Sequence, residues 1–258
     1  MGMKEKISIT IDTELIKQAD SIIDGISVRN RSQALESLLR KALSERTIDC
    51  VVILSGGDLK ELEFEGTYKP LVKIDGSPIL LDTVRKFRSV GITKVIVAAG
   101  PITEKVFDLL GDGSEYGVNV IYVKDRDAGT AGAVRAAARY IKGPFFVVLG
   151  DVHFEFDIKK MISFHRTNRE LATIAVSVAE LGDSKDSIKI TGNRITEFRY
   201  NAVGVKTHHV NAGVYLFETE VISRIPKKGS LEKETLPALA RNGHLCGFVF
   251  SGKWKHLN

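Results

Sequence analysis

Residues 50–78 read CVVILSGGDLKELEFEGTYKPLVKIDGSP and decide the fold that the rest of the chain completes. The run Val51–Leu54 is apolar and mostly β-branched, which is typical of a strand buried on both faces of a parallel sheet. It stops at Ser55-Gly56-Gly57, where glycines let backbone N–H groups approach an anion. Lys69 can bring a mobile positive charge to the same place. We therefore predict a ligand loop after this strand, although a plain strand-to-turn junction would also use glycine.

Composition sets broad limits on the class of protein. The 258 residues, 43% of them hydrophobic, suit one large α/β domain or a large domain with a small appendage. The net charge of +5 and pI near 9.1 favour an anionic partner but do not separate nucleic acid from a phosphorylated metabolite. No apolar run reaches the roughly 20 residues of a membrane helix, and MGMKEKISI lacks a secretory apolar stretch. We expect a cytoplasmic protein with no membrane partner, in which Cys50 and Cys246 are buried free thiols.

The first 48 residues have a pattern of their own. Residues 6–11 alternate, with three isoleucines on one face and Lys6, Ser8 and Thr10 on the other, which predicts a half-buried strand. Asp12 can cap one helix, and Asn30 can cap a second in which Gln33 reaches back. A lone strand has no partner for its backbone groups, and so short a segment cannot close a core, so a second copy must complete it.

This segment, with its RNRSQALESLL helix start, resembles the ribbon-helix-helix family of the Arc, MetJ and CopG type. The resemblance implies a homodimer paired through the N-terminal strand and a ribbon that enters the major groove of double-stranded DNA. By position, the base-facing residues would be Lys6, Ser8 and Thr10, and the phosphate-binding residues would be Arg29, Asn30, Arg31 and Ser32. The alternative is a dimerisation arm alone, because residues 1–48 hold eight Lys and Arg against seven Asp and Glu.

The remainder alternates helical and strand patterns. We predict helices at 78–90, 102–110, 129–141, 157–167 and 231–241, and strands at 94–98, 118–123, 145–149, 172–178, 187–190, 195–199, 210–217 and 245–250. The first half has the order of a parallel sheet wrapped by helices, with ligands at the carboxyl ends of its strands. Later strands come in hairpin-like pieces, which suits a mixed sheet. We expect two domains, residues 1–48 and 49–258, joined without a glycine-rich spacer.

Five segments resemble the sugar-1-phosphate nucleotidyltransferase family. They are LSGGDLKELEFEGTYKPLVKIDGSPIL, AGTAGAVRAAARYI, FFVVLGD, VNAGVYLF and SLEKETLPALARNGHLCGFVFSGKW. The resemblance implies an α/β fold with a Rossmann-like mixed sheet and transfer of a nucleotidyl group to a sugar phosphate with Mg²⁺. By position it assigns nucleotide contacts to Gly56, Gly57, Lys69, Gly129 and Thr130, with Lys69 the catalytic cation if the chain is active, and metal binding to Asp151.

Three departures from the family pattern weaken the case for catalysis. The loop G-T-R becomes Leu59-Lys60-Glu61, so a carboxylate stands where the pattern has an arginine. The second metal aspartate, in W-x-D-x-G, is replaced by His256, and the sugar-binding E-K-P run is absent near 200–202. His153 and Glu155 alternate with Asp151 and could replace the lost ligand, although solvated loop residues are the simpler interpretation.

Our main hypothesis is a dimeric DNA-binding regulator whose degenerate domain binds a nucleotide, nucleotide sugar or sugar phosphate. The first alternative is an active sugar-1-phosphate nucleotidyltransferase in which Lys60 or Lys69 supplies charge, Asp151 and His256 hold Mg²⁺, and the N-terminal arm serves assembly. A structural dimer with an empty pocket is the second. A guanidinium over the reacting centre, from Arg126 or Arg135, would argue against the regulator.

Overall fold

The computed structural model describes residues 6–124, 128–178, 186–200 and 209–257. By its internal contacts the chain divides into two compact units, Met1–Thr47 and Ile48–Asn258. Within the described residues, no helix has both the length and the apolar character needed to cross a membrane.

The first unit consists of two helices with the predicted caps. Helix α1 (Thr13–Asp20) begins where the Asp12 carboxylate accepts a hydrogen bond from the Glu14 N–H at 2.8 Å. Helix α2 (Arg31–Arg46) follows Asn30, whose Oδ1 accepts from the Gln33 N–H at 3.0 Å, while the Gln33 side chain accepts from the Arg29 N–H at 2.7 Å. The predicted reciprocal cap is confirmed, except that the Gln33 side chain bonds the N–H of Arg29 rather than that of Asn30.

The strand predicted at residues 6–11, which was expected to pair with a second copy, is not formed in the single chain. Residues 6–12 have no regular secondary structure, and the side chains of Ile7 and Ile9 are 68% and 59% exposed. The physical reason is that an isolated segment has no neighbouring strand to satisfy its backbone donors and acceptors.

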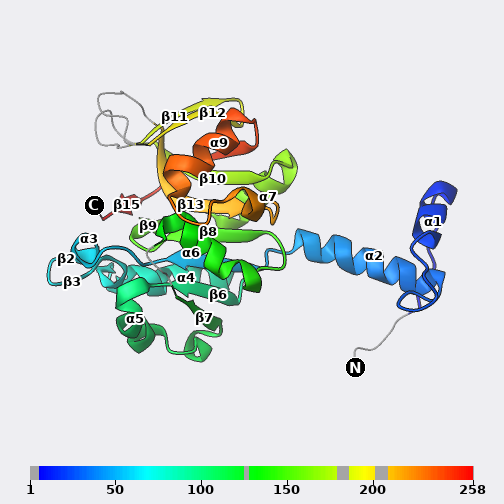
Figure 1. The fold of residues 1–258 in the computed structure, drawn as a ribbon, viewed down its shortest axis with the longest axis horizontal. Helices are drawn as coiled ribbons and strands as arrows, with labels where there is room; N and C mark the ends of the chain where they lie inside the picture. The colour runs from blue at the N-terminus through cyan, green and yellow to red at the C-terminus, as the bar shows by residue number, and fades with distance from the viewer. Residues whose placement is uncertain (1–5, 125–127, 179–185, 201–208, 258) are drawn as a thin grey trace. The chain divides into compact units, whose positions relative to one another are not determined.

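A mixed sheet of nine strands forms the frame of the second unit (Figure 1). Its order is β11-β12-β14-β10-β13-β8-β1-β6-β7. Strands β8, β1, β6 and β7 run parallel, whereas β13 is antiparallel to both β8 and β10. The bounds are β1 Cys50–Leu54, β6 Lys94–Ala98, β7 Asn119–Val123, β8 Phe145–Leu149, β10 Ala172–Val178, β11 Ser187–Thr191, β12 Arg194–Arg199, β13 His209–Phe217 and β14 Leu245–Phe250. The predicted α/β mixed sheet is confirmed.

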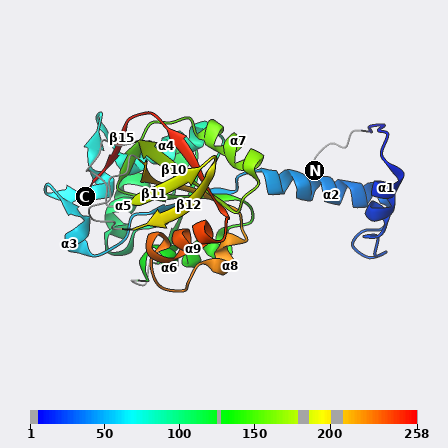
Figure 2. The same ribbon diagram turned by 90° about the horizontal axis from the view of Figure 1, so that it is seen from above.

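Strand β1 is buried on both faces because its side chains alternate between two hydrophobic cores. Val51 and Ile53 belong to one core, and Val52 and Leu54 belong to the other. Helices α4, α5 and α7 contribute to the first core, and α6, α8 and α9 to the second, on the opposite face of the sheet (Figure 2). Their bounds are α4 Ile79–Ser89, α5 Thr103–Leu110, α7 Ile158–Asn168, α6 Gly129–Ala137, α8 Val221–Arg224 and α9 Leu236–Arg241.

Short elements close the ends of the sheet. Helix α3 is Leu59–Leu62, and the two-stranded pairs are β2 (Glu63–Phe64) with β3 (Thr67–Tyr68), β4 (Lys73–Ile74) with β5 (Ser77–Pro78), and β9 (Val152–Phe154) with β15 (Trp254–His256). The 3₁₀ turns are η1 Lys69–Leu71, η2 Gly100–Ile102, η3 Ser114–Tyr116 and η4 Ala138–Tyr140, and η5 Leu231–Thr235 is a π-helical turn before α9. The pairing of β9 with β15 joins residues about 100 positions apart and places His256 opposite Val152.

Candidate active site

A cavity of about 300 Å³ lies at the carboxyl ends of β1 and β8, within the second unit. Leu54 and Leu149, the last residues of these parallel strands, are part of its wall. Its polar lining is Ser55, Glu61, Thr130, Asp151, Asp186, Tyr200, Asn211, Glu232 and His256. Stretches of sequence that lie far apart, from Ser55 to His256, therefore supply polar groups to one space.

The loop after β1 forms part of the cavity wall and packs tightly against Gly150. The Ser55 N–H donates to the carbonyl of Ala98 at 2.8 Å. Ser55 is 1% exposed, and its Oγ has no hydrogen-bond partner among the described residues. A Cβ atom on Gly150 would lie 2.3 Å from that Oγ, so only glycine fits at this junction. The unpartnered hydroxyl of Ser55 is a group that a ligand could satisfy.

A buried carboxylate, Glu232, is held by three hydroxyl groups. It accepts hydrogen bonds from Thr130 Oγ1 at 2.9 Å, Ser230 Oγ at 2.7 Å and the Tyr215 hydroxyl at 3.2 Å. The Tyr215 hydroxyl in turn accepts from Asn211 Nδ2 at 2.9 Å, and burial, followed by the Glu232 charge, raises the pKa of Tyr215 well above its usual value. This network fixes the N-terminus of α6 against η5 and aims Asn211 along the cavity wall.

Asp151 and His256 meet because β9 pairs with β15. The His256 Nε2 lies 3.2 Å from Asp151 Oδ2, and the Leu257 N–H donates to the Asp151 carbonyl at 3.0 Å. Both side chains are partly exposed to the cavity. The two residues predicted to hold metal are therefore adjacent, and each is the other's polar partner.

The described lining of the cavity is acidic. It contains the carboxylates of Glu61, Asp151, Asp186 and Glu232 and no lysine or arginine. The acidic lining also affects Tyr200, because burial and then the nearby carboxylates raise the pKa of its hydroxyl. A cation lies close to this wall, where Lys233 Nζ is 5.2 Å from the centre of the Tyr200 ring.

Of the two arginines proposed as possible replacements, the described one, Arg135, does not bring its guanidinium to the cavity lining. Arg135 Nη1 donates to the carbonyl of Ile222 at 2.9 Å, and Arg135 is not part of the cavity lining. Arg126 lies outside the described residues, as do Asn201 and Ala202 of the missing sugar motif.

The predicted site residues fall into two groups. Gly56, Thr130, Asp151 and His256 line the cavity, whereas the lining does not include Gly57, Lys69 or Gly129. Gly129 instead has φ +70° and packs so closely on the carbonyl of Gly229 that a Cβ would lie 2.3 Å from it. His153 and Glu155 are also absent from the lining.

Three of the residues predicted to contact DNA, Arg29, Asn30 and Arg31, make local contacts within the first unit. Arg31 donates through Nε and Nη2 to Asp20 at 2.8 and 2.6 Å and thereby lowers the pKa of that carboxyl. Asn30 is used as a helix cap and Arg29 Nε donates to the carbonyl of Ile26. Ser32 is exposed, as are Lys6, Ser8 and Thr10.

Sequence reasoning did not select several residues that line the cavity. Ser55, Asn211 and Glu232 stood inside segments quoted for the family resemblance, but nothing in their spacing indicated a shared wall. Their convergence depends on the antiparallel placement of β13 beside β8 and on η5 packing against α6. Only the long-range pairing of the sheet brings these groups together.

Comparison with solved structures supports the fold. A protein described as a glucose-1-phosphate thymidylyltransferase from Bacillus anthracis aligns with TM-score 0.70 and 24% identity over 80% of this chain and 89% of that chain. HddC from Yersinia pseudotuberculosis aligns with TM-score 0.69 and 24% identity, over 81% of this chain and 93% of that one.

Curated relatives share more of the sequence. A mannose-1-phosphate guanyltransferase of Saccharomyces cerevisiae is 31% identical over 196 residues, which cover 72% of this chain and 54% of that protein. A mannose-1-phosphate guanylyltransferase of Mycobacterium tuberculosis is 29% identical over 227 residues, or 83% and 62% of the two chains. The chain thus spans a little over half the length of the curated relatives it matches.

These findings overturn the main functional hypothesis. The relatives are named as transferases and none of the findings supports DNA binding, so the prediction of a DNA-binding regulator with a non-catalytic domain is wrong, and the enzymatic alternative is favoured. The sequence profile of the family described as nucleotidyl transferase matches residues 50–257, which include every described residue that lines the cavity. The chain belongs to the nucleotidyl transferase family.

Proposed function

We propose that this chain transfers a nucleotidyl group from a nucleoside triphosphate to a sugar 1-phosphate, with GTP and mannose 1-phosphate as the first pair to test. The names of the relatives suggest this pair. The single observation that supports the activity most is the convergence of Gly56, Thr130, Asp151 and Asn211 on one cavity. These residues come from four of the segments that carry the family resemblance.

The cavity offers hydrogen-bonding groups suited to both substrates. Backbone N–H groups near Gly56 and the unpartnered Ser55 hydroxyl can receive the nucleotide. On the other wall, the Asn211 amide and the Tyr200 hydroxyl can bind the hydroxyl groups of a sugar. Such placement lets the sugar phosphate oxygen attack the α-phosphorus in line, with pyrophosphate as the leaving group.

The residues at Asp151 fit Mg²⁺, which the family generally uses. Mg²⁺ is commonly held by one or two carboxylates together with substrate phosphates, and Asp151 presents a partly exposed carboxylate at the cavity. His256 offers a nitrogen, a poorer ligand for this ion, and its 3.2 Å contact suits a role in orienting Asp151. When bound, the ion would neutralise charge on the phosphates.

Lysine side chains are the remaining source of positive charge. Lys69 is half-buried beside Pro70, which lines the cavity, and it forms no ion pair within the described part of the chain. A lysine side chain is long and flexible, so Lys69 can turn toward a bound triphosphate. We keep Lys69 as the proposed catalytic cation and add Lys233, beside Tyr200, as a second candidate.

Release of pyrophosphate tests the proposal directly. The full chain is mixed with Mg²⁺, GTP and mannose 1-phosphate, and then with a panel of other triphosphates and sugar 1-phosphates. Asp151→Asn should lower turnover by about 100-fold, the usual scale for losing one charge-stabilising group. Asp108→Asn, which removes an exposed carboxylate on α5, is the matched control and should leave turnover unchanged. Folded protein that releases no pyrophosphate with any pair would overturn the proposal.

We also propose that residues 1–48 form an assembly domain that pairs two copies of the chain. Among residues 6–39, only Ala19 and Ala34 are buried, whereas Ile7, Ile9 and Ile26 are 68%, 59% and 80% exposed. So little buried apolar surface cannot stabilise a unit of this size alone. A second copy would cover the same surface symmetrically.

A further inference from the structure

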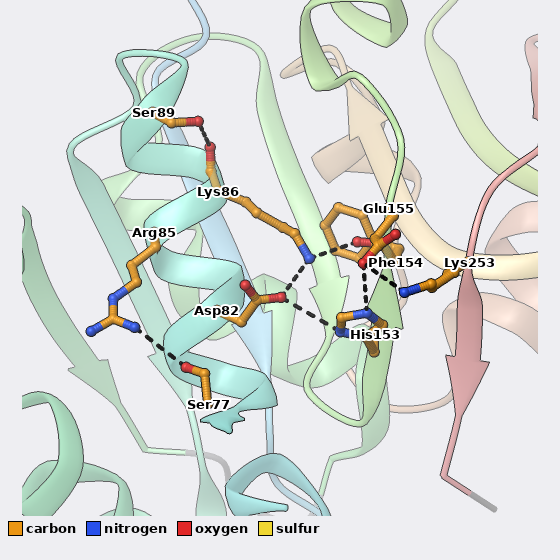
Figure 3. A network of polar contacts seen from close by, with 9 residues as sticks. All are labelled: Ser77, Asp82, Arg85, Lys86, Ser89, His153, Phe154, Glu155 and Lys253. Atoms are coloured by element: carbon orange, nitrogen blue, oxygen red, sulfur yellow. Dashed lines mark hydrogen bonds and ion pairs between the residues drawn. The ribbon is translucent and has the colours of Figure 1, made fainter. Parts of the chain in front are cut away.

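His153 is a buried histidine, and within the described part of the chain neither of its ring nitrogens has a hydrogen bond. It lies in the middle of β9 and is 8% exposed. Its Nδ1 lies 3.5 Å from Asp82 Oδ2 and its Nε2 lies 3.6 Å from Glu155 Oε1, both longer than an N–H···O hydrogen bond (Figure 3). Buried polar groups in native proteins almost always have a hydrogen-bond partner or bind an ion, so the two ring nitrogens of His153 need an explanation.

A third side chain, Asp75, completes a cluster around this imidazole. Asp75 lies in the turn between β4 and β5, and Glu155 follows β9 directly. One ligand atom each from Asp75, His153 and Glu155 lies within 4.8 Å of the other two. Around a tetrahedral metal with bonds of about 2.1 Å, neighbouring ligand atoms are about 3.4 Å apart. The separation of 3.6 Å between His153 and Glu155 already matches that spacing.

Asp82 is placed to fix the tautomer of His153. Lys86 forms an ion pair with Asp82 and donates to the Phe154 carbonyl at 2.7 Å, which holds the Asp82 carboxylate beside Nδ1 (Figure 3). A carboxylate next to Nδ1 favours the proton on that nitrogen and leaves the lone pair on Nε2. Nε2 is the nitrogen that faces Glu155, so the arrangement is that of a carboxylate supporting a metal-binding histidine.

The charges around the cluster also favour a cation. Asp75, Asp82 and Glu155 are three carboxylates, whereas Lys86 and Lys253 supply two positive charges. Lys253 Nζ lies 4.0 Å from Glu155 and its side chain is 74% exposed, so water screens much of its effect. With a neutral imidazole, the cluster retains negative charge.

We propose that Asp75, His153 and Glu155 bind a divalent transition-metal ion such as Zn²⁺. An imidazole nitrogen with two carboxylate oxygens suits Zn²⁺ and related ions better than Mg²⁺. The cavity lining includes none of the three residues, so this site is separate from the proposed nucleotide site. The ion would join the β4–β5 turn to β9, and β9 begins directly after the cavity residue Asp151.

Metal titration of the full chain tests the site without measuring turnover. Protein stripped with a chelator is titrated with Co²⁺ in excess Mg²⁺, and the visible absorption of Co²⁺ is followed, then its displacement by Zn²⁺. We expect one tightly bound ion per chain. Glu155→Gln and Asp75→Asn should each weaken binding by about 100-fold or more, and Asp82→Asn by about 10- to 100-fold. Both direct ligands in that set are exposed carboxylates, so their replacement should leave the fold intact.

Two controls separate this site from unspecific binding. Glu115→Gln removes an exposed carboxylate elsewhere, and His244→Gln removes a histidine that lies 3.5 Å from Glu170 without forming this cluster. Neither should change the affinity for Co²⁺. The proposal is overturned if no ion binds, if Glu155→Gln and Asp75→Asn bind as tightly as the parent chain, or if Asp151→Asn alone removes binding. A failure of the transferase assay would leave each of these readouts unaffected.

Discussion

Replacing Glu61 by glutamine should increase the catalytic efficiency of the proposed transferase with its nucleoside triphosphate. Glu61 lines the cavity from α3 and has no ion pair within the described residues. Two other carboxylates of the lining are already engaged, Glu232 by three hydroxyl groups and Asp151 by His256. An incoming phosphate therefore meets an uncompensated charge at Glu61.

The size of the cavity sets the strength of the repulsion between Glu61 and a bound phosphate. A space of about 300 Å³ is roughly 8 Å across if spherical, so a bound phosphate charge lies within about that distance of Glu61. At an effective dielectric of about 20, two unit charges 8 Å apart repel by about 2 kcal/mol. Because Glu61 is exposed, screening should reduce this to about 1 kcal/mol. That corresponds to about a five-fold rise in kcat/KM.

The assay compares kcat/KM for the triphosphate at low and high salt. Glu61→Gln should rise about five-fold at low salt and less at high salt, since salt screens exposed charges. Glu63→Gln, a neighbouring exposed carboxylate outside the lining, is the matched control and should stay unchanged. A fall in kcat/KM for Glu61→Gln would refute the reasoning and indicate instead that Glu61 binds a metal or a substrate hydroxyl.

Three further predictions concern stability and assembly. Burial raises the pKa of Cys50 to about 12 and of Cys246 to about 11, so their stabilisation is present below pH about 9 and is lost as pH rises toward those values. As the pH rises from 8.5 to 11, the urea midpoint of unfolding should therefore fall less in a Cys50→Ala variant than in the parent chain. Equal falls in the two proteins would contradict this. Tyr215→Phe removes a buried hydroxyl with two hydrogen bonds and should cost about 2–4 kcal/mol of unfolding free energy; a loss below about 0.5 kcal/mol in urea denaturation would refute it. The double change Ile7→Lys and Ile9→Lys should convert the proposed dimer to monomer in light scattering, and an unchanged mass would exclude pairing through this segment.

Local patterns were sufficient to predict most elements of the second unit. Strand β1 is a short β-branched run that ends in glycine, and its buried position on both faces follows from that composition. The predicted strand 145–149 is the strand β8 found, and the predicted helix 78–90 became α4, Ile79–Ser89. The buried free thiols are also confirmed. In each case the information lies within a dozen consecutive residues.

Features that need distant residues were missed. The three-residue strands β9 and β15 are too short to show alternation, and they exist because they pair with each other across the second unit. That pairing brings Asp151 to His256. In the first unit, residues 6–11 alternate in sequence but form no strand within the single chain.

The inference to a lack of catalysis compared the chain with the family motifs one position at a time, at Glu61, at His256 and at the absent sugar-binding run. Stabilisation of a phosphoryl centre is a sum over all nearby charges, and a carboxylate at one position changes that sum by about 1 kcal/mol when it is exposed. Lys69 and Lys233 are near the cavity wall and can move, and a divalent ion at Asp151 would contribute two charges at once. A position-by-position comparison with a motif registers the lost arginine but not these substitutes. The Glu61→Gln variant measures the contribution of this one residue, because its effect on kcat/KM is the share of the sum that Glu61 supplies.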